Sequence, residues 1–226
     1  MRKLENIANL PILFLKHPTS LRHMFSWLRS LFNAGAQNEL PWIAFDAVLW
    51  LKSYLQPHMN VFEYGSGGST IFFLKRVKKI ISIEHAQTWF EQVDARLKKQ
   101  GALNYEYFLI KPQQSGTAQV PYSYTSYTST SADVENLNFE QYVKSIEKYP
   151  DKYFELVFID GRARASCIYH AVKKIRWGGY LLLDNSDRQE YQETISLLLK
   201  DCARRDFSGI TCASIYFSKT SIWKII

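Results

Sequence analysis

The chain has 226 residues, of which 46% are hydrophobic and 22% are charged, and this composition excludes a disordered or fibrous protein. A chain of this length can bury a sizeable core without disulfides or metals to hold it together. The net charge of +7 at pH 7 permits an anionic partner, but no stretch is basic enough to be a nucleic-acid-binding tail.

The cysteines and the hydropathy pattern bear on the compartment. Cys167, Cys202 and Cys212 are odd in number and form no CxxC pair, so the sequence predicts neither a disulfide framework nor a zinc knuckle. No run of about 18 apolar residues occurs, and no membrane-spanning helix is predicted. We therefore expect a cytoplasmic protein without a cleaved leader.

Residues 1–57 are expected to form an N-terminal helical extension. Apolar residues repeat at intervals of three and four over residues 21–32, which is typical of one helical face, and a second helix is expected over residues 42–55. The simplest expectation is that both helices pack on the main domain. In the alternative, the first helix, with Arg22 and Arg29, makes a peripheral contact with a membrane surface or a partner.

From residue 58 the pattern changes to alternating strands and helices, which is typical of a parallel sheet with helices on both faces. The predicted strands are 61–64, 79–84, 105–110, 155–160 and 180–184, and the predicted helices are 70–76, 87–99, 165–176 and 191–205. Two further strands, 209–216 and 220–226, are expected to form an antiparallel hairpin. We predict an α/β fold over residues 58–226, with a doubly wound, mostly parallel, seven-stranded sheet.

A long connection at residues 113–150 interrupts this alternation. Its residues 122–131 are ten consecutive Tyr, Ser or Thr residues, and such a polar, aromatic tract cannot build a core of its own. Long connections inside a compact domain are usually functional or disordered. We expect either a lid or substrate-binding loop, or an insertion that contacts no ligand.

The loop after the first predicted strand contains Gly65 and Gly67, which allow positive φ and close approach of the backbone to a ligand. Thr70 stands where the dinucleotide fingerprint GxGxxG needs its third glycine, and no lysine follows as in a phosphate loop, so neither motif is present. In open parallel sheets, ligands bind beyond the carboxyl ends of the strands, where this loop lies.

Two carboxylates accompany this loop. Glu63 precedes the first glycine, where it disfavours a phosphate and suits a cationic or hydroxyl-bearing ligand. Glu84 ends the second predicted strand, at the position where an acidic residue binds the two hydroxyls of a ribose. The pattern predicts a nucleoside ligand that carries positive charge and lacks a pyrophosphate.

Over residues 60–226 the sequence resembles the class I S-adenosylmethionine-dependent methyltransferases. The motifs that carry the resemblance are Val61–Thr70, Ile83–His85, Phe158–Gly161 and Gly178–Asn185, with Ser69 in place of the third glycine of the first motif. The resemblance implies S-adenosylmethionine as cofactor. The residues it implies for cofactor binding are Glu63, Gly65, Ser66, Gly67, Ser69, Thr70, Glu84, His85 and Asp160.

The resemblance also implies a role for most of these positions. The backbone from Gly65 to Gly67 would face the methionine part of the cofactor, and Glu63 would lie near its amino group or hold the loop. Glu84 would bind the ribose, and His85 would flank the adenine or serve in packing.

Asp160, Asp184 and Asn185 follow two strands that should be neighbours, roughly 4.8 Å apart, and could share an oxygen-rich site. Two carboxylates and an amide suit Mg²⁺. The arrangement is similar to that of the metal-dependent catechol-type O-methyltransferases, except that Ala163 stands where those enzymes have a catalytic lysine. We expect Asp160 and Asp184 to be catalytic, either through Mg²⁺ bound with Asn185 or by bracing loops and orienting the acceptor directly.

Three arginines, Arg162, Arg164 and Arg188, are predicted at the same edge of the sheet. Arginine binds carboxylate or phosphate through two parallel hydrogen bonds, so these residues could hold an anionic acceptor. The alternative is that they form salt bridges with Asp184, Asp187 and neighbouring loops.

We therefore predict a methyltransferase that acts on a small or exposed acceptor, at oxygen rather than nitrogen. A nucleic-acid methyltransferase is an alternative, but residues 160–163 lack the Asn/Asp-Pro-Pro-Tyr/Phe loop of amino-group methylases, and no dense basic stripe occurs. The sequence is also compatible with a non-catalytic protein that binds S-adenosylmethionine and, although the missing third glycine disfavours it, with a dinucleotide oxidoreductase.

Overall fold

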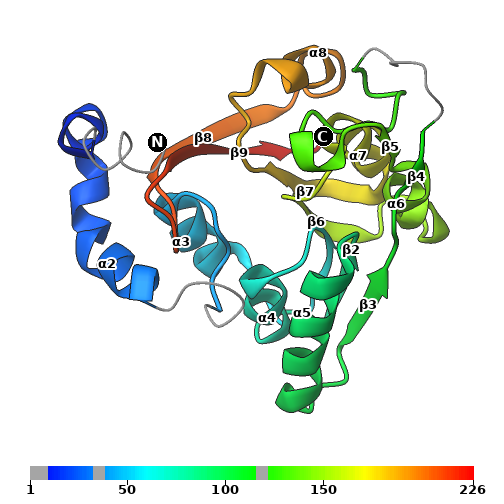
Figure 1. Ribbon diagram of the computed structural model, residues 1–226, viewed down its shortest axis with the longest axis horizontal. Helices are drawn as coiled ribbons and strands as arrows, with labels where there is room; N and C mark the ends of the chain where they lie inside the picture. The colour runs from blue at the N-terminus through cyan, green and yellow to red at the C-terminus, as the bar shows by residue number, and fades with distance from the viewer. Residues whose placement is uncertain (1–9, 33–38, 116–121) are drawn as a thin grey trace.

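The computed structural model describes residues 10–32, 39–115 and 122–226. At its centre is a seven-stranded mixed sheet with the strand order β3-β2-β1-β6-β7-β9-β8 (Figure 1). Its strands are β1 (Asn60–Tyr64), β2 (Lys79–Glu84), β3 (Tyr105–Leu109), β6 (Phe154–Ile159), β7 (Ile175–Leu183), β8 (Ala203–Ile210) and β9 (Phe217–Lys224). Strand β9 lies antiparallel between β7 and β8, whereas the pairs from β3 to β7 are parallel. The predicted sheet and its antiparallel C-terminal hairpin are confirmed.

Helices cover both faces of this sheet. The α-helices are α2 (Met24–Phe32), α3 (Phe45–Tyr54), α4 (Gly68–Leu74), α5 (Gln87–Gln100), α6 (Glu140–Lys144), α7 (Arg164–Ala171) and α8 (Gln189–Leu198). Short 3-10 helices are η1 (Pro18–His23), η3 (Ala132–Val134), η4 (Ser145–Lys148) and η5 (Val172–Lys174). One core cluster joins the sheet to α3, α4 and α5, and the other joins it to α6, α7 and α8.

Strand β1 shows why the central strands are almost continuously apolar. Phe62 and Tyr64 belong to the cluster under α6, α7 and α8, whereas Val61 belongs to the cluster under α3, α4 and α5. All three side chains are fully buried. A strand that is covered on both faces must be apolar at successive positions, because side chains alternate between the faces.

The predicted N-terminal helices both contact the sheet. Ala47 and Leu51 of α3 are fully buried in the same cluster as Val61 of β1. Helix α2 packs through Trp27 against Ile210 and Cys212, at the end of β8 and in the turn that follows it. The domain boundary predicted at residue 57 stays a prediction.

The predicted insertion at 113–150 contains two short strands that pair with each other, β4 (Gln113–Gln114) and β5 (Leu137–Asn138), followed by α6 and η4. Its last part enters the main core, since Phe139, Tyr142, Val143 and Ile146 are all fully buried. Residues 116–121 lie outside the described residues.

The C-terminal elements differ in their bounds from those predicted. Helix α8 ends at Leu198, and β8 begins at Ala203, where the sequence predicts a helix as far as residue 205. Residues 203–206 are exposed, and all but Ala203 are polar, because β8 is the edge strand of the sheet; they therefore lack the alternation that marks a half-buried strand.

The glycines at 178 and 179 are also placed differently, since they lie inside β7 rather than at the end of α7. Gly178 has φ +77°, and a Cβ at Gly179 would lie 2.8 Å from the Glu155 carbonyl oxygen. The register with β6 shifts between Phe154 and Leu156. The two glycines therefore permit an irregularity within β7 that a residue with a side chain would disfavour.

The loops after β1 and β6 cross each other at two glycines. Gly65 has φ +89°, and a Cβ there would lie 2.7 Å from both the N and the Cα of Gly161. A Cβ on Gly161 would lie 3.0 Å from the backbone nitrogen of Gly65 and would clash with the hydroxyl of Tyr142 in α6. The insertion thus packs against the loop crossing from behind.

Gly161→Ala should lower the free energy of unfolding by about 1–3 kcal/mol, because the added methyl group overpacks the crossing. Tyr142→Phe removes the hydroxyl that the methyl group meets, so the double variant should regain part of this loss. Urea denaturation of the wild type, both single variants and the double variant measures the coupling. Strictly additive effects would contradict this packing.

Candidate active site

The residues predicted at the strand ends meet at one edge of the sheet. Tyr64, the last residue of β1, is in register with Ile83 of β2 and Ile159 of β6, and Ile159 is in register with Leu183 of β7. A cavity of about 760 Å³ opens at this edge. Its lining includes Gly65, Ser66, Glu84, His85, Asp160, Arg162, Asp184, Asn185 and Arg188 from the predicted set.

Glu63 lies beneath the glycine loop and is fully buried. Its Oε2 accepts hydrogen bonds from the hydroxyls of Thr70 (2.7 Å) and Ser82 (2.5 Å), and the Thr70 Oγ1 accepts one from the Gly67 amide (3.0 Å). This chain of bonds fixes the loop to the start of α4. Of the predicted cofactor residues, Glu63, Gly67, Ser69 and Thr70 do not line the cavity.

Glu84 is a buried carboxylate at the cavity wall. Its Oε2 accepts hydrogen bonds from the amide and hydroxyl of Ser66 (3.1 and 2.9 Å), and its Oε1 accepts them from the amides of His85 and Ala86 (2.8 and 2.9 Å). Burial acts to raise the pKa of Glu84, but hydrogen bonds from His85, Ala86 and Ser66 outweigh it and hold the pKa below its usual value. Glu84 therefore presents a fixed negative charge to the cavity.

Two tryptophans that the sequence analysis missed also line the cavity. The indole Nε1 of Trp89 in α5 donates a hydrogen bond to the Ser66 carbonyl oxygen at 2.7 Å. Trp42, which precedes α3, meets the Trp89 ring edge-on at a centroid distance of 5.9 Å. Neither tryptophan lies in a motif, so no local sequence signal marks them.

The turn between β8 and β9 supplies another unpredicted part of the wall, through Thr211, Ser214 and Tyr216, and the first residues of β9 add Phe217 and Ser218. Its contribution was hidden because the sequence analysis placed residues 209–216 in a strand. The same turn contacts the N-terminal helices, since the indole of Trp27 donates a hydrogen bond to the Ser214 carbonyl oxygen at 2.6 Å.

Arg164 is buried behind the cavity and does not line it. Its guanidinium donates hydrogen bonds to the carbonyl oxygens of Gly161 (3.0 Å), Asp160 (3.0 Å) and Asp184 (2.5 Å), and to the Asp160 carboxylate at 2.9 Å. Its donors are taken up by the two strand ends, which agrees with the alternative expectation that the arginines form salt bridges with neighbouring groups. Arg164 therefore links the end of β6 to the end of β7.

The two predicted catalytic carboxylates differ in their surroundings. Burial raises the pKa of Asp160 to about 7, although the charge of Arg164 acts to lower it. Burial also raises the pKa of Asp184, whose Oδ1 accepts hydrogen bonds from Thr220 (2.7 Å) and Ser218 (3.2 Å). Asp160 therefore has the freer carboxylate of the two, since its side chain is 24% exposed and that of Asp184 is almost fully buried.

The donor set predicted for Mg²⁺ does not fit a divalent cation. The Oδ1 atoms of Asp160, Asp184 and Asn185 already accept hydrogen bonds from arginine side chains or from hydroxyls of β9, and Arg164 supplies the positive charge between the strand ends. Residues 10–32, 39–115 and 122–226 contain no group of three or more His, Cys, Asp or Glu side chains that could hold a metal. The structure gives the Mg²⁺ prediction no support.

Arg162 and Arg188 do line the cavity, as the sequence predicts for acceptor-binding residues. Arg162 forms an ion pair at 2.8 Å with Asp133, which lies in the predicted insertion. Arg188 donates a hydrogen bond to the Asn185 side-chain oxygen at 3.1 Å. Both arginines are only partly engaged, so each retains donors that can face a ligand.

Comparison with solved structures identifies the fold. A protein of Streptococcus mutans assigned as a methyltransferase, solved in complex with SAH, matches with a TM-score of 0.52 and 11% identity, over 77% of this chain and 93% of that chain. An rRNA methylase of Streptococcus thermophilus matches with a TM-score of 0.52 and 12% identity, over 78% and 93%. A protein of Clostridium thermocellum assigned as an rRNA methylase matches with a TM-score of 0.52 and 14% identity, over 80% and 95%.

These likenesses, together with the strand order, show that the chain has the Rossmann-like fold of class I S-adenosylmethionine-dependent methyltransferases. No protein-family model and no curated protein matches the sequence. No helix among the described residues is long and apolar enough to cross a membrane.

Arg164→Met should lower the free energy of unfolding by about 3–5 kcal/mol, because it leaves the buried Asp184 and the partly buried Asp160 without their compensating charge. Arg162→Met is the matched control: the partner of Arg162 is exposed, and we expect a loss of about 1 kcal/mol or less. Urea denaturation at neutral pH distinguishes the two. Equal losses in the two variants would show that Arg164 does not hold the strand ends together.

Glu63→Gln should change the pH dependence of stability. Burial raises the pKa of Glu63 from 4.5 to about 7, against the hydrogen bonds of Ser69, Ser82 and Thr70. The folded state therefore binds this proton more tightly than the unfolded state, and the stability it contributes at low pH is lost as the pH rises from about 4.5 to about 7. Glu63→Gln removes this loss, so relative to wild type it should gain about 2 kcal/mol between the two ends of that range.

Unfolding free energies measured by urea denaturation on either side of this pH range test the expectation. The exposed Glu91→Gln is the matched control and should follow the wild type at every pH. A Glu63→Gln curve parallel to that of the wild type would contradict the inferred protonation of Glu63.

Proposed function

We propose that this protein is an S-adenosylmethionine-dependent methyltransferase that acts on a small or exposed acceptor, at oxygen. The observation that carries the proposal is the cavity at the carboxyl edge of the sheet, walled by the Gly65 loop and by the fixed carboxylate of Glu84. The fold supports it, because ligands of open parallel sheets bind beyond these strand ends.

The lining of the cavity supports the proposed cofactor at each of its parts. At Gly65 the backbone itself forms the wall, which permits the close approach that the methionine part needs. Glu84 can accept hydrogen bonds from the ribose hydroxyls, and the rings of His85 and Trp89 offer flat surfaces to the adenine. A negatively charged wall also favours a cationic sulfonium over a phosphate.

When bound, the cofactor supplies an electrophilic methyl group on sulfur. The chain must then orient the acceptor and remove its proton. Asp160 is suited to the second task, because it lines the cavity and its pKa of about 7 lets it accept a proton near neutral pH. Arg164 holds the Asp160 carboxylate in place from behind.

The remaining wall favours an acceptor with an anionic group and an apolar or planar body. Arg162 and Arg188 supply donors for the anion, while Trp42, Tyr216 and Phe217 supply aromatic surface. The ion pair between Arg162 and the predicted insertion brings that segment to the rim of the cavity, which supports a role for it in substrate binding.

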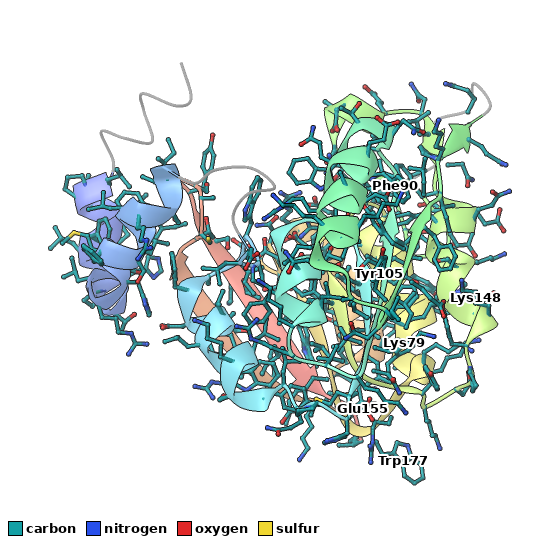
Figure 2. All side chains as sticks on the ribbon, turned by 90° about the horizontal axis from the view of Figure 1, so that it is seen from below. Lys79, Phe90, Tyr105, Lys148, Glu155 and Trp177 are labelled. Carbon is teal, nitrogen blue, oxygen red and sulfur yellow. The ribbon has the colours of Figure 1, made fainter. Side chains whose placement is uncertain are left out.

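A nucleic-acid acceptor is the second candidate, and one surface feature favours it. A groove of about 770 Å³ beside the end of β3 is lined by Phe108, Lys111, Lys144 and Lys148, among other residues. The Lys148 ammonium lies 3.6 Å from the centre of the Phe108 ring, and Figure 2 shows Lys148 at the outer side of the domain. Lysines beside an aromatic ring suit a phosphate backbone with a stacked base.

Glu84→Gln should weaken the binding of S-adenosylmethionine and SAH by about tenfold or more, since a charge-assisted hydrogen bond contributes about 1.5–3 kcal/mol. Glu106→Gln is the matched control, because Glu106, on β3, pairs with Lys79 and Tyr149 and does not line the cavity. Titration calorimetry measures both. No binding by the wild type would rule out the proposed cofactor, and equal binding by both variants would rule out the role of Glu84.

Asp160→Asn should reduce methyl transfer by about 100-fold or more if Asp160 is the general base, while cofactor binding persists. The assay incubates the protein with methyl-labelled cofactor and fractionated cell extract, with and without chelator and ribonuclease. Label in small molecules that is unaffected by chelator supports the proposal. Label that ribonuclease releases would establish the nucleic-acid alternative, and cofactor binding without any transfer would indicate a non-catalytic binding protein.

A further inference from the structure

The N-terminal helices expose an unusual concentration of apolar side chains. Of the fourteen large hydrophobic side chains that are exposed in the described part of the chain, six lie between residues 12 and 28. They are Ile12, Leu15, Leu21, Met24, Phe25 and Leu28. Scattered apolar residues on a surface are ordinary, but a contiguous group marks an interaction site.

Four of these residues form one stripe along η1 and α2. Leu21, Met24, Phe25 and Leu28 follow the spacing of three and four that places side chains on one helical face, and Phe25 is 80% exposed. We call these four residues the apolar stripe. It does not belong to the protein core.

The opposite face of α2 is already occupied. Trp27 is buried against the β8–β9 turn, and the Ser30 hydroxyl accepts a hydrogen bond from the Ala213 amide at 2.9 Å. Figures 1 and 2 show these helices at one end of the molecule, beside β8 and β9 and away from α5. Because the helices are anchored from behind, the apolar stripe is held facing outwards.

The charges around the apolar stripe indicate which kind of partner it binds. Residues 10–32 contain Lys16, Arg22 and Arg29 and no Asp or Glu. Arg22 and Arg29 are one heptad apart and lie beside the apolar stripe on the helical projection, and both are exposed, although Arg22 also pairs with Asp46 of α3 at 2.5 Å. A second copy of the chain would bring the same cations together without carboxylates from this segment, whereas an anionic bilayer offers negative headgroups over an apolar interior.

We propose that the apolar stripe docks on the surface of a membrane that contains anionic lipids. An amphipathic helix with basic residues at its edge lies in the plane of the interface, with its apolar side chains inserted among the headgroups. Phe25, Leu28 and Met24 enter the bilayer, and Arg29 and Lys16 lie against the headgroups. The proposal is independent of the methyltransferase function, because it needs no cofactor or acceptor.

Sedimentation of the full-length protein with vesicles tests it. The wild type should pellet with phosphatidylcholine–phosphatidylglycerol vesicles, more weakly with pure phosphatidylcholine vesicles, and less as salt rises. Phe25→Ser with Leu28→Ser should reduce the binding constant by about tenfold or more. Leu103→Ser is the matched control, since Leu103 is 97% exposed outside the apolar stripe, and it should bind as the wild type does.

Two charge-reversal variants measure the electrostatic contribution to vesicle binding. Arg29→Glu should weaken binding to the anionic vesicles by about fivefold or more, whereas Lys99→Glu, an equal charge change at an exposed position of α5, should have little effect. A wild type that fails to pellet, or a Phe25→Ser, Leu28→Ser variant that pellets as the wild type does, would overturn the proposal. So would sedimentation equilibrium that shows a wild-type dimer and a monomeric double variant, because the apolar stripe would then be an interface between copies.

Discussion

The site depends on the hydrogen bonds that one buried arginine, Arg164, makes to two strand ends. The sheet ends at β6 and β7 with two carboxylates, Asp160 and Asp184, that burial would otherwise drive to the neutral form. Arg164 reaches both strand ends with one planar group and donates to their backbone as well as to a carboxylate. A lysine could not reproduce these bonds, because its ammonium lacks the fork of the guanidinium. The position of Asp160 at the cavity therefore follows from a residue that does not touch the cavity.

The same arginine explains why a resemblance to metal-dependent enzymes is partial. Two aspartates and an asparagine at neighbouring strand ends look like a metal site in the sequence. In the folded chain the positive charge between them is the guanidinium of Arg164, the first residue of α7. Ala163, in the position expected for lysine, adopts a left-handed conformation at the start of this helix. The proposed chemistry accordingly relies on side chains of the protein to position the acceptor and accept its proton.

The amino-acid sequence predicts structure best where burial dictates residue type. Strands β1, β2, β3 and β6 were predicted to within one residue at each end, because segments such as Val61–Tyr64 and Phe154–Ile159 are buried and mostly apolar on both faces. Glu84 and Asp160 were found because their chemistry follows from their place at strand ends. Trp42, Trp89 and the β8–β9 turn could not be found this way, since they reach the cavity only through tertiary packing.

The crossing of Gly65 and Gly161 has a consequence for the history of this chain. Each glycine occupies the space that a side chain on the other would need, and Tyr142 closes the remaining space behind Gly161. A side chain at either position is disfavoured while the other two residues stay as they are. Substitutions at these three positions should therefore be coupled during evolution, so that the segment 113–150 and two separate loops change in concert.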